Sequence, residues 1–582
     1  MAGLFCACND SVGGAKAPRI STVPAQSVSG GSTFTLDLST YVTDGTLTAT
    51  YAVVSGGGSF AGSVYSQAFP TIGSYTVKFK VTDFRGEHSE ASFTVKVTSA
   101  ELGVVKVGSG VSLYDAGTGN FAEAFQADGQ GKTYKTALAD GSLVFEFSST
   151  GQTDIHLYNP GDDDRIPVAY DSLKSERYVL KTSTDRILFE RGASPERTLH
   201  LFDPLNKGVV QVTSGLAGPR DERDAKITTG DIIYFESAGS SGGDIYYYDV
   251  AKAMTGAVST DSGDEDLVAV LPNDAIVYRR QSGTGGYALH YHKKGFGTAE
   301  VGNGLGSAYD NLSRVYKGVT SDSRVVFETT STAGNTDLHI WNPSDLVTTT
   351  IASSASDETY RGVTGSARVV YAVEVSATDH DLFVFNPADG TSDELLTSAE
   401  LENFNASLGN GDIIFTTSDG SDLDLYLYDE SVGSSAAIAS TATSEVFDKL
   451  LADGNFVYTV GGSVHHYDTG TATDTSVTTA AGTEAFAGET SGGGFVIKLT
   501  TGGQDDLYRW TGSNPATAVS TDAGTDTFGA ATSAGKVLFT RVASGTTTAN
   551  VFVFDPSDSS TAQLTSNTVN DSVLAVINAV GK

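Results

Sequence analysis

A six-residue pattern recurs in recognisable form eleven times between residues 111 and 555. Clear copies are residues 154–159 (DIHLYN), 337–342 (DLHIWN), 381–386 (DLFVFN) and 424–429 (DLYLYD). The closing ring positions follow one another at intervals of 39 to 49 residues, most of them 43 to 46. A period in this range, with a strand in every copy, is typical of a β-propeller, because each repeat is one sheet that buries its faces only against its neighbours.

Each period carries four candidate strands joined by turns rich in Gly, Asn, Asp and Ser. In one period these strands are residues 404–408, 412–416, 424–428 and 436–440. Short connections of this composition join antiparallel neighbours. We therefore expect an all-β chain in which residues 102–582 form a large β-propeller of about eleven four-stranded repeats.

The repeat begins and ends out of phase. The propeller region opens with the second strand of a blade, residues 103–107, and the final strand, residues 572–577, has no successor. The last strand is therefore predicted to become the innermost strand of the first blade, which would close the ring and remove exposed sheet edges. Eleven periods exceed the usual four to eight blades. Short links favour one ring over two stacked rings, with residues 293–311 as the candidate hinge in the second case.

The chain before the propeller divides in two. Residues 1–17 are expected to be a flexible tether, and they hold both cysteines of the protein. Ala7 directly before Cys8 resembles the end of a bacterial lipoprotein signal, which implies a lipid on Cys8; the alternative is a plain disordered terminus. Residues 18–98 alternate as strands do. The stretch 73–83 and the strand 93–97 resemble bacterial immunoglobulin-like and cadherin-like domains, which implies a β-sandwich that acts as a spacer or adhesive module.

The formal net charge is −34, from 70 acidic and 36 basic residues. Such a surface repels phosphate backbones, so nucleic acid is excluded as a partner. It suits cations or basic partners, or it is simply a well-solvated coat. Because no apolar run is long enough to cross a bilayer, membrane attachment is expected only through a lipid anchor.

An acidic residue stands two positions before the first apolar residue of the innermost strand in nine periods. Innermost strands line the channel of a propeller, so these carboxylates are candidates to surround one mouth and bind a cation or a basic segment. The alternative is that they cap loops or bond neighbouring blades. The predicted binding residues are Glu176, Glu265, Glu358, Glu402, Glu445, Glu484, Asp526 and Asp571; Glu222 is the ninth, but Asp224 breaks the pattern after it.

Five of the nine histidines occupy one position of the signature strand, where other copies hold Tyr or Phe: His156, His200, His290, His339 and His465. A position that accepts all three rings is expected to pack between neighbouring blades. The aspartate that begins the strand is expected to accept hydrogen bonds from the backbone of the preceding turn. Residues 162–164 and 419–424 gather oxygen ligands that suit calcium, but neither has the spacing of a known loop. Apart from calcium, no cofactor is expected.

Together the repeats resemble the TolB-like family of propeller repeats. The resemblance covers residues 102–582 and rests on the turn and strand at 410–420, the strand at 424–429, and Ser440-Thr441 followed by Glu445. The family's usual Ser-Pro-Asp-Gly turn is replaced here by forms such as Ala452-Asp453-Gly454, as in a divergent branch. Members of that family act as periplasmic or surface interaction platforms, and some propellers of this type carry lyase or peptidase sites. The resemblance implies an extracytoplasmic protein, at the cell surface, in the periplasm or secreted.

Two functions fit these features. The favoured one is a non-enzymatic binding or structural scaffold for protein or glycan partners at the cell surface. The other is a polysaccharide lyase or hydrolase with its site at the propeller mouth, which needs one period that departs from the rest. The nearest departure is Tyr278-Arg279-Arg280 together with His290, His292, Lys293 and Lys294. The sequence contains neither a phosphate-binding glycine loop nor a His-Glu-x-x-His motif.

Overall fold

The computed structural model describes residues 17–577 except 25, 30–32, 44–48, 70–72, 99–100, 161–163, 170, 172, 214–220, 240–241, 262, 282–285, 306–312, 332–333, 478 and 480. Its strands are β1 to β53, and the described residues contain no α-helix. The prediction of an all-β chain is confirmed. The chain divides into two compact units, residues 1–145, 156–166 and 573–582 in the first and residues 146–155 and 167–572 in the second. The predicted tether and Cys8 lie outside the described residues, apart from residue 17.

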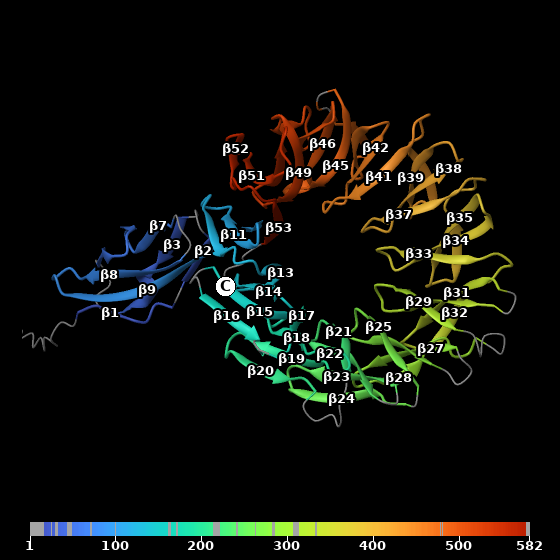
Figure 1. Cartoon of the computed structure of the whole chain (residues 1–582), viewed down its shortest axis with the longest axis horizontal. Coiled ribbons are helices and arrows are strands. Elements are labelled where there is room, and N and C mark those ends of the chain that lie inside the picture. The colour runs from blue at the N-terminus through green and yellow to red at the C-terminus, as the bar shows by residue number, and fades with distance from the viewer. Residues whose placement is uncertain are drawn as a thin grey trace, which may run out of the picture. The chain divides into compact units, whose positions relative to one another are not determined.

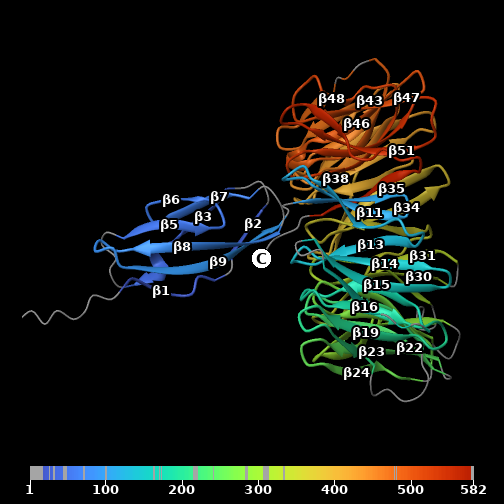
Figure 2. The ribbon, with the colours of Figure 1, turned by 60° about the vertical axis from the view of Figure 1, so that its left-hand side comes forward.

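The first nine strands form three sheets around one apolar core. One sheet has the order β2 (Gln26–Ser29), β9 (His88–Thr98), β8 (Gly73–Thr82), β5 (Thr50–Ser55); a second has β3 (Thr33–Asp37), β7 (Val64–Ala68), β6 (Ser59–Ala61); and β1 (Arg19–Ile20) pairs with β4 (Val42–Thr43). The long strands β8 and β9 are prominent in Figure 2. Alternate residues of both strands, such as Val77, Phe79, Phe93 and Val95, point into the core. The immunoglobulin-like identity of this region stays a prediction.

Eleven four-stranded antiparallel blades follow, numbered here 1 to 11. Their strands run from β10 to β53 in the following order. Blade 1 is β53 (Asp571–Ile577), β10 (Leu102–Val107), β11 (Gly110–Asp115), β12 (Phe121–Phe125); blade 2 is β13 (Gly131–Ala137), β14 (Leu143–Ser149), β15 (Gln152–Asn159), β16 (Asp164–Ala169); blade 3 is β17 (Glu176–Lys181), β18 (Ile187–Arg191), β19 (Thr198–Asp203), β20 (Gly208–Gln211); blade 4 is β21 (Asp221–Ile227), β22 (Ile232–Gly239), β23 (Gly242–Asp249), β24 (Met254–Ser259); blade 5 is β25 (Glu265–Val270), β26 (Ile276–Gln281), β27 (Tyr287–Lys293), β28 (Gly297–Glu300); blade 6 is β29 (Arg314–Val319), β30 (Val325–Thr330), β31 (Thr336–Asn342), β32 (Val347–Ala352).

The remaining five blades keep the same order. Blade 7 is β33 (Glu358–Val363), β34 (Val369–Ser376), β35 (Asp379–Asn386), β36 (Thr391–Glu394); blade 8 is β37 (Asn403–Ser407), β38 (Ile413–Ser418), β39 (Leu423–Asp429), β40 (Ser434–Ala439); blade 9 is β41 (Glu445–Leu450), β42 (Phe456–Val460), β43 (Ser463–Asp468), β44 (Thr473–Ser476); blade 10 is β45 (Thr483–Glu489), β46 (Phe495–Thr501), β47 (Gln504–Trp510), β48 (Thr517–Ser520); blade 11 is β49 (Gly524–Ala531), β50 (Val537–Ala543), β51 (Ala549–Asp555), β52 (Ser560–Gln563). Within the second unit the blades lie side by side in chain order (Figure 1). A single parallel bridge, between Asp505 of β47 and Thr525 of β49, joins blades 10 and 11 into one eight-stranded sheet. The repeated four-stranded arrangement confirms the predicted β-propeller architecture.

The out-of-phase repeat is explained by the first blade. Its innermost place is taken by β53, which neighbours β10. This is the pairing that the sequence predicts for the last strand. Closure of the propeller into one ring stays a proposal.

Every innermost strand of blades 3 to 11 carries a register irregularity at the same place. The pairing skips one residue after the aromatic or aliphatic residue, as between Tyr360 and Gly362 or between Phe404 and Ala406; blade 4 skips two residues. Such a bulge adds one residue to one strand, bends it and strengthens its twist. The repeat of the bulge shows that each blade bends its innermost strand in the same way.

The residue after this bulge is a point of contact between neighbouring blades. A Cβ added to Gly362 of blade 7 would lie 2.7 Å from Cε1 of Phe404 in blade 8, and Gly318 and Gly488 meet rings of Tyr360 and Phe528 in the same way. The aromatic ring of one innermost strand therefore rests on the bare backbone of the strand before it. These positions need glycine because of close approach rather than backbone conformation.

We expect Gly362→Ala to destabilise the protein by about 1–3 kcal/mol, since an extra carbon in a packed contact forces its neighbours to move. The matched control is Gly409→Ala, because a Cβ at Gly409 meets nothing within 4 Å. The control is expected to stay within about 0.5 kcal/mol of the parent protein. Denaturant unfolding of the two variants checks this, and equal stability would contradict the inter-blade contact.

Deleting residues 571–582 removes β53 and leaves β10 without its neighbour on that side. An exposed strand edge is a template for pairing with another chain. We expect the truncated protein to melt at a lower temperature and to associate, as measured by thermal unfolding and light scattering. A monodisperse truncated protein of unchanged melting temperature would rule out β53 as a closing strand.

Candidate functional site

The eight predicted binding carboxylates all lie at or near the beginning of innermost strands, and all are buried. None exposes more than 7% of its surface. Each belongs to its own blade. Their prediction as a site for a cation or basic segment stays a prediction. The structure shows the bonding of these carboxylates except Glu265, whose two buried oxygens have no hydrogen-bond partner within the described part of the chain.

Three carboxylates of the repeated position bond to the preceding blade. Oε2 of Glu402 in blade 8 accepts from the N–H of Leu382 in blade 7 at 2.8 Å. The equivalent bonds join Glu222 to the N–H of Leu199 at 2.6 Å and Glu484 to the N–H of Val464 at 3.0 Å. In each case the donor is the second residue of the signature pattern. We call this bond the inter-blade latch.

Other carboxylates of this position bond to partners in their own blade or in the link that precedes it. Glu176 and Asp526 accept from the guanidinium groups of Arg191 and Arg541 on the neighbouring strand of their own blades, at 3.1 and 2.8 Å. Three more carboxylates accept hydrogen bonds from the link that precedes their strand. Glu358 accepts from the N–H of Ser354, Glu445 from Oγ1 of Thr441, and Asp571 from Nδ2 of Asn567. The same sequence position therefore serves as latch or cap.

Burial strongly affects the acidity of several of these groups. It raises the pKa of Glu176, Glu265 and Glu402 to about 7, because removing a carboxylate from water disfavours its charged form. For Glu402 the bonds from Leu382 and Ser398 act in the opposite direction. A shifted pKa at a structural contact affects stability rather than chemistry.

The histidine position of the signature strand is a stacking position. His200, His290 and His339 lie parallel to the ring directly opposite on the second strand, with centroids 5.4, 5.2 and 5.3 Å apart. In blades 4, 7, 8 and 11 a Tyr or Phe makes the same stack. Burial lowers the pKa of these three imidazoles to about 4, so they are neutral at pH 7. The rings pack, but the stacking partner lies in the same blade, and packing of this position between neighbouring blades stays a prediction.

The basic residues of blade 5 are engaged in ion pairs and ring contacts. Arg279 Nε lies 2.7 Å from Asp266 Oδ2, and its guanidinium lies over the ring of Tyr287. Arg280 pairs with Asp261. Lys294 pairs with Asp249 of blade 4. The structure therefore uses the predicted catalytic candidates as contacts within and between blades.

The aspartate at the start of the signature strand accepts from side chains in some copies. Asp154 and Asp337 accept from side-chain amides of the preceding turn, Gln152 and Asn335. The turn backbone bonds instead to the next link: the N–H of Thr336 donates to Asp357 at 2.7 Å. That the aspartate accepts from the backbone of its turn stays a prediction.

No group of three or more metal-ligating side chains is found among the described residues. Asp419, one of the calcium candidates, accepts from the N–H groups of Ser421 and Asp422 within its own turn. Asp162 and Asp163 of the other candidate lie outside the described residues. Calcium stays a prediction.

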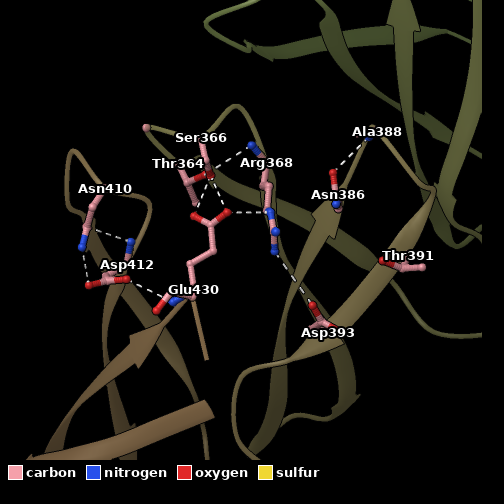
Figure 3. Close-up of polar contacts among 12 residues, drawn as sticks. Thr364, Ser366, Arg368, Asn386, Ala388, Thr391, Asp393, Asn410, Asp412 and Glu430 are labelled. Atoms are coloured by element: carbon pink, nitrogen blue, oxygen red, sulfur yellow. Dashed lines mark hydrogen bonds and ion pairs between the residues drawn. The ribbon is translucent and has the colours of Figure 1, made fainter. Parts of the chain in front are cut away.

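Figure 3 shows an inter-blade contact that the sequence pattern did not single out. Glu430, in the hairpin after β39 of blade 8, accepts from Ser366 Oγ and lies 2.7 Å from Nε of Arg368, both in blade 7. Its own N–H donates to Asp412 at 3.0 Å. The corresponding turn of blade 3 is held in the same way by Asp231 of blade 4, which accepts from Ser183 N–H and Oγ. A carboxylate reaching back by one blade was not visible in the sequence, because its position in the period varies.

A pocket of about 410 Å³ lies between the hairpins of blades 2 and 3. It is lined by Gln152, Lys174 and Glu196, with the backbone of Gly151 and Gly192. This size falls in the range of small-ligand pockets. Both charges at its rim are exposed.

No protein-family model and no curated protein sequence matches the chain. Among solved structures it is similar to dipeptidyl peptidase 4 of Porphyromonas gingivalis, at 10% identity and a TM-score of 0.38 over 63% of this chain and 64% of that one. It is also similar to a putative TolB from Agrobacterium tumefaciens, at 12% identity and a TM-score of 0.21 over 39% and 88%. A third is oligogalacturonate lyase from Vibrio parahaemolyticus, at 10% identity and 0.28 over 57% and 100%. The chain spans just under two thirds of the peptidase.

We expect Glu402→Gln to alter the pH dependence of stability. The raised pKa of Glu402 means that the folded form holds this proton from about pH 4.5 to 7 while the unfolded form releases it. The stabilising contribution is therefore complete below pH 4.5 and is lost as the pH rises through 7. Because glutamine does not titrate, the melting temperature of the variant should improve relative to the parent as the pH rises from 5 to 8.

The control for this experiment is Glu374→Gln, since Glu374 is exposed. It should follow the parent at every pH. Glu402→Ala leaves the N–H of Leu382 without its acceptor and should destabilise by about 1–3 kcal/mol. A Glu402→Gln variant that tracks the parent across the whole pH range would contradict the assignment.

Proposed function

We propose that this protein is an extracytoplasmic, non-enzymatic scaffold that binds protein or glycan partners. The observation that carries the proposal is how the repeat uses its polar residues. Carboxylates latch blades together, imidazoles are buried in neutral stacks, and the arginines of blade 5 are paired. Because these polar side chains are used to hold the blades together, they support a scaffold for binding rather than a catalytic site.

The acidic surface supports the same proposal. A net charge of −34 favours basic protein segments as partners and keeps the molecule soluble where concentrations are high. For glycans, the concave surface with the best fit is the pocket that Gln152, Lys174 and Glu196 line. These three side chains offer both donors and acceptors, as hydroxyl recognition requires.

The extracytoplasmic setting is part of the proposal. It is supported by the resemblance of the repeat to surface and periplasmic platforms and of the N-terminus to a lipoprotein signal. Among the described residues no helix has the length and apolar character needed to span a membrane.

The binding test uses the full chain immobilised on a sensor and exposed to a panel of neutral and acidic glycans and to polylysine as the basic probe. We expect saturable binding to at least one probe. Binding to polylysine should weaken as salt rises from 50 to 300 mM, since exposed charges are screened. Glycan binding should fall in Lys174→Ala, and it should persist in Lys317→Ala, whose lysine pairs with Glu328 in blade 6 instead. A panel with no saturable response would count against the scaffold.

The enzymatic alternative is tested on acidic and neutral polysaccharides, with unsaturated products followed by ultraviolet absorbance and new reducing ends by a colorimetric assay. We expect no product. Product that disappears in Arg279→Ala or Arg280→Ala would establish catalysis at blade 5 and overturn the proposal. These two arginines are chosen because each forms an ion pair with an aspartate, Asp266 or Asp261, in or beside blade 5.

A further inference from the structure

The hairpins between the third and fourth strands of blades 3, 4 and 5 each carry one large exposed apolar side chain. Leu205 is 95% exposed, Met254 49% and Phe296 58%. They belong to residues 203–208, 249–254 and 293–297, which lead into β20, β24 and β28 (Figure 1). We call these three segments the basic hairpins.

The places of these side chains within the hairpins differ, since Leu205 lies two residues after Asp203, Met254 is the first residue of β24 and Phe296 directly precedes β28. Exposed apolar side chains also lie on the hairpins of blades 6 and 8, at Leu346, Val347 and Val432, so it is the charge of their hairpins that sets blades 3 to 5 apart. Three large exposed apolar side chains on three successive hairpins need an explanation that a lone exposed residue does not.

The charge of the basic hairpins is opposite to that of the protein. They hold four lysines, Lys207, Lys252, Lys293 and Lys294, against two aspartates, Asp203 and Asp249. The equivalent hairpins of blades 6 to 8, residues 342–347, 386–391 and 429–434, hold four acidic residues and no basic one. In a chain of net charge −34 the basic hairpins are thus a local exception. The hairpin of blade 2 is acidic and lies partly outside the described residues, so the surface is confined to blades 3 to 5.

Ion pairs hold the three hairpins beside one another. The guanidinium of Arg186 lies 3.4 Å from Asp203 in the hairpin of blade 3 and donates to the carbonyl of Val250 in the hairpin of blade 4 at 3.3 Å. Lys294 of the blade 5 hairpin pairs with Asp249 of blade 4 and lies over the ring of Tyr247. Both aspartates are therefore neutralised, and the apolar tips are presented by one connected surface.

The other three lysines differ in their exposure. Lys207 is exposed, Lys252 keeps 67% of its side chain exposed beside Asp249, and Lys293 is half-buried. The acidic groups at the same end of these blades are Asp185, Asp231 and Asp274, and each is held by neighbours: Lys181, Ser183, and Thr229 with Gly230. Lys252 also forms an ion pair with Asp249, at 3.5 Å, whereas the exposed Lys207 has no ion-pair partner within the described part of the chain. With four lysines against two aspartates, the hairpins keep a net positive charge beside the apolar tips.

The backbone of the hairpins is already satisfied. The N–H of Leu205 donates to Asp203 and that of Gly208 to Asn206, while Lys252 N–H donates to Asp249 and Phe296 N–H to the carbonyl of Lys293. Entering a less polar medium is costly for a backbone group only when its hydrogen bond is missing. These four N–H groups already have acceptors, so this cost does not arise for them.

We propose that the basic hairpins dock onto an anionic lipid bilayer, with Leu205, Met254 and Phe296 in the interfacial region and Lys207, Lys252 and Lys293 at the headgroup phosphates. Apolar side chains flanked by lysine are what such an interface binds. A protein partner is less suited, because three tips a blade apart offer far less contact than the roughly 1,200–2,000 Å² of a stable interface. The acidic remainder of the chain is screened beyond about 8 Å at physiological salt.

The test is co-sedimentation of the full chain with vesicles of phosphatidylcholine alone or with 30% phosphatidylglycerol, about the anionic share that a charged surface needs. The chain carries Cys6→Ser and Cys8→Ser, so that no acyl group contributes. We expect binding to the anionic vesicles that weakens with salt. The triple variant Leu205→Ser, Met254→Ser, Phe296→Ser should bind about tenfold more weakly or less, and Lys207→Gln, Lys252→Gln, Lys293→Gln should lose the preference for anionic vesicles.

The matched control is Val432→Ser, a 70% exposed apolar residue on the blade 8 hairpin, where Asp429 and Glu430 replace the lysines. It should bind like the parent, and all variants should keep the parent's circular dichroism and melting temperature because the changed side chains are exposed. Absence of vesicle binding overturns the proposal, as does full binding by either triple variant. Self-association of the parent that the apolar triple variant abolishes, without vesicle binding, would identify an interface between copies instead. None of these outcomes bears on glycan or polylysine binding.

Discussion

The packing of each blade on its neighbour is the constraint on which the repeat depends, and in blades 4, 8 and 10 a bond from a third-strand N–H of the preceding blade to a buried carboxylate fixes it. A four-stranded sheet cannot bury both of its faces alone, so each blade must be oriented on its neighbour. Apolar packing is not directional. The latch of Glu402 on Leu382, and of Glu222 and Glu484 on their partners, adds a direction. Together with the aromatic ring seated on Gly362 or Gly488, it positions one innermost strand against the next.

The same constraint explains why the buried carboxylates and imidazoles of the repeat take part in bonding and packing. A buried carboxylate is costly unless it is bonded or protonated. The repeat answers with backbone donors at Glu402, with arginine at Glu176 and Asp526, and with pKa values raised by burial. The imidazoles are likewise neutral within stacks. What distinguishes one blade from another lies largely at the hairpins, where side chains are more exposed than those of the strands. The change from lysine in blades 3 to 5 to aspartate and glutamate in blades 6 to 8 is of this kind.

Much of the architecture could be predicted because the signature strand is a periodic signal. Alternating residues, a ring at a regular interval and turn residues at the right places predict four-stranded blades. Even the place of β53 beside β10 follows from the phase of the repeat. The roles of side chains were harder to predict. The bulge after residues such as Tyr360 or Phe404 reverses which side the following residues face, and no local signal marks it. The carboxylates at or near the start of the innermost strands are buried, and which donor each one finds depends on how neighbouring blades pack.

The sequence by itself determined the all-β class, the number of repeats, the strand order of each blade and the acidic character of the whole chain. These properties are local or additive: strand alternation, turn chemistry and the sum of charges need no knowledge of distant contacts. Only the tertiary structure decided which groups meet, because Glu430 and Arg368, or Arg186 and Val250, are separated by more than sixty residues and meet only when neighbouring blades pack. It also decided that Leu205, Met254 and Phe296 stand exposed beside lysines on three linked hairpins. Their exposure is a property of the assembled blades and not of any one segment.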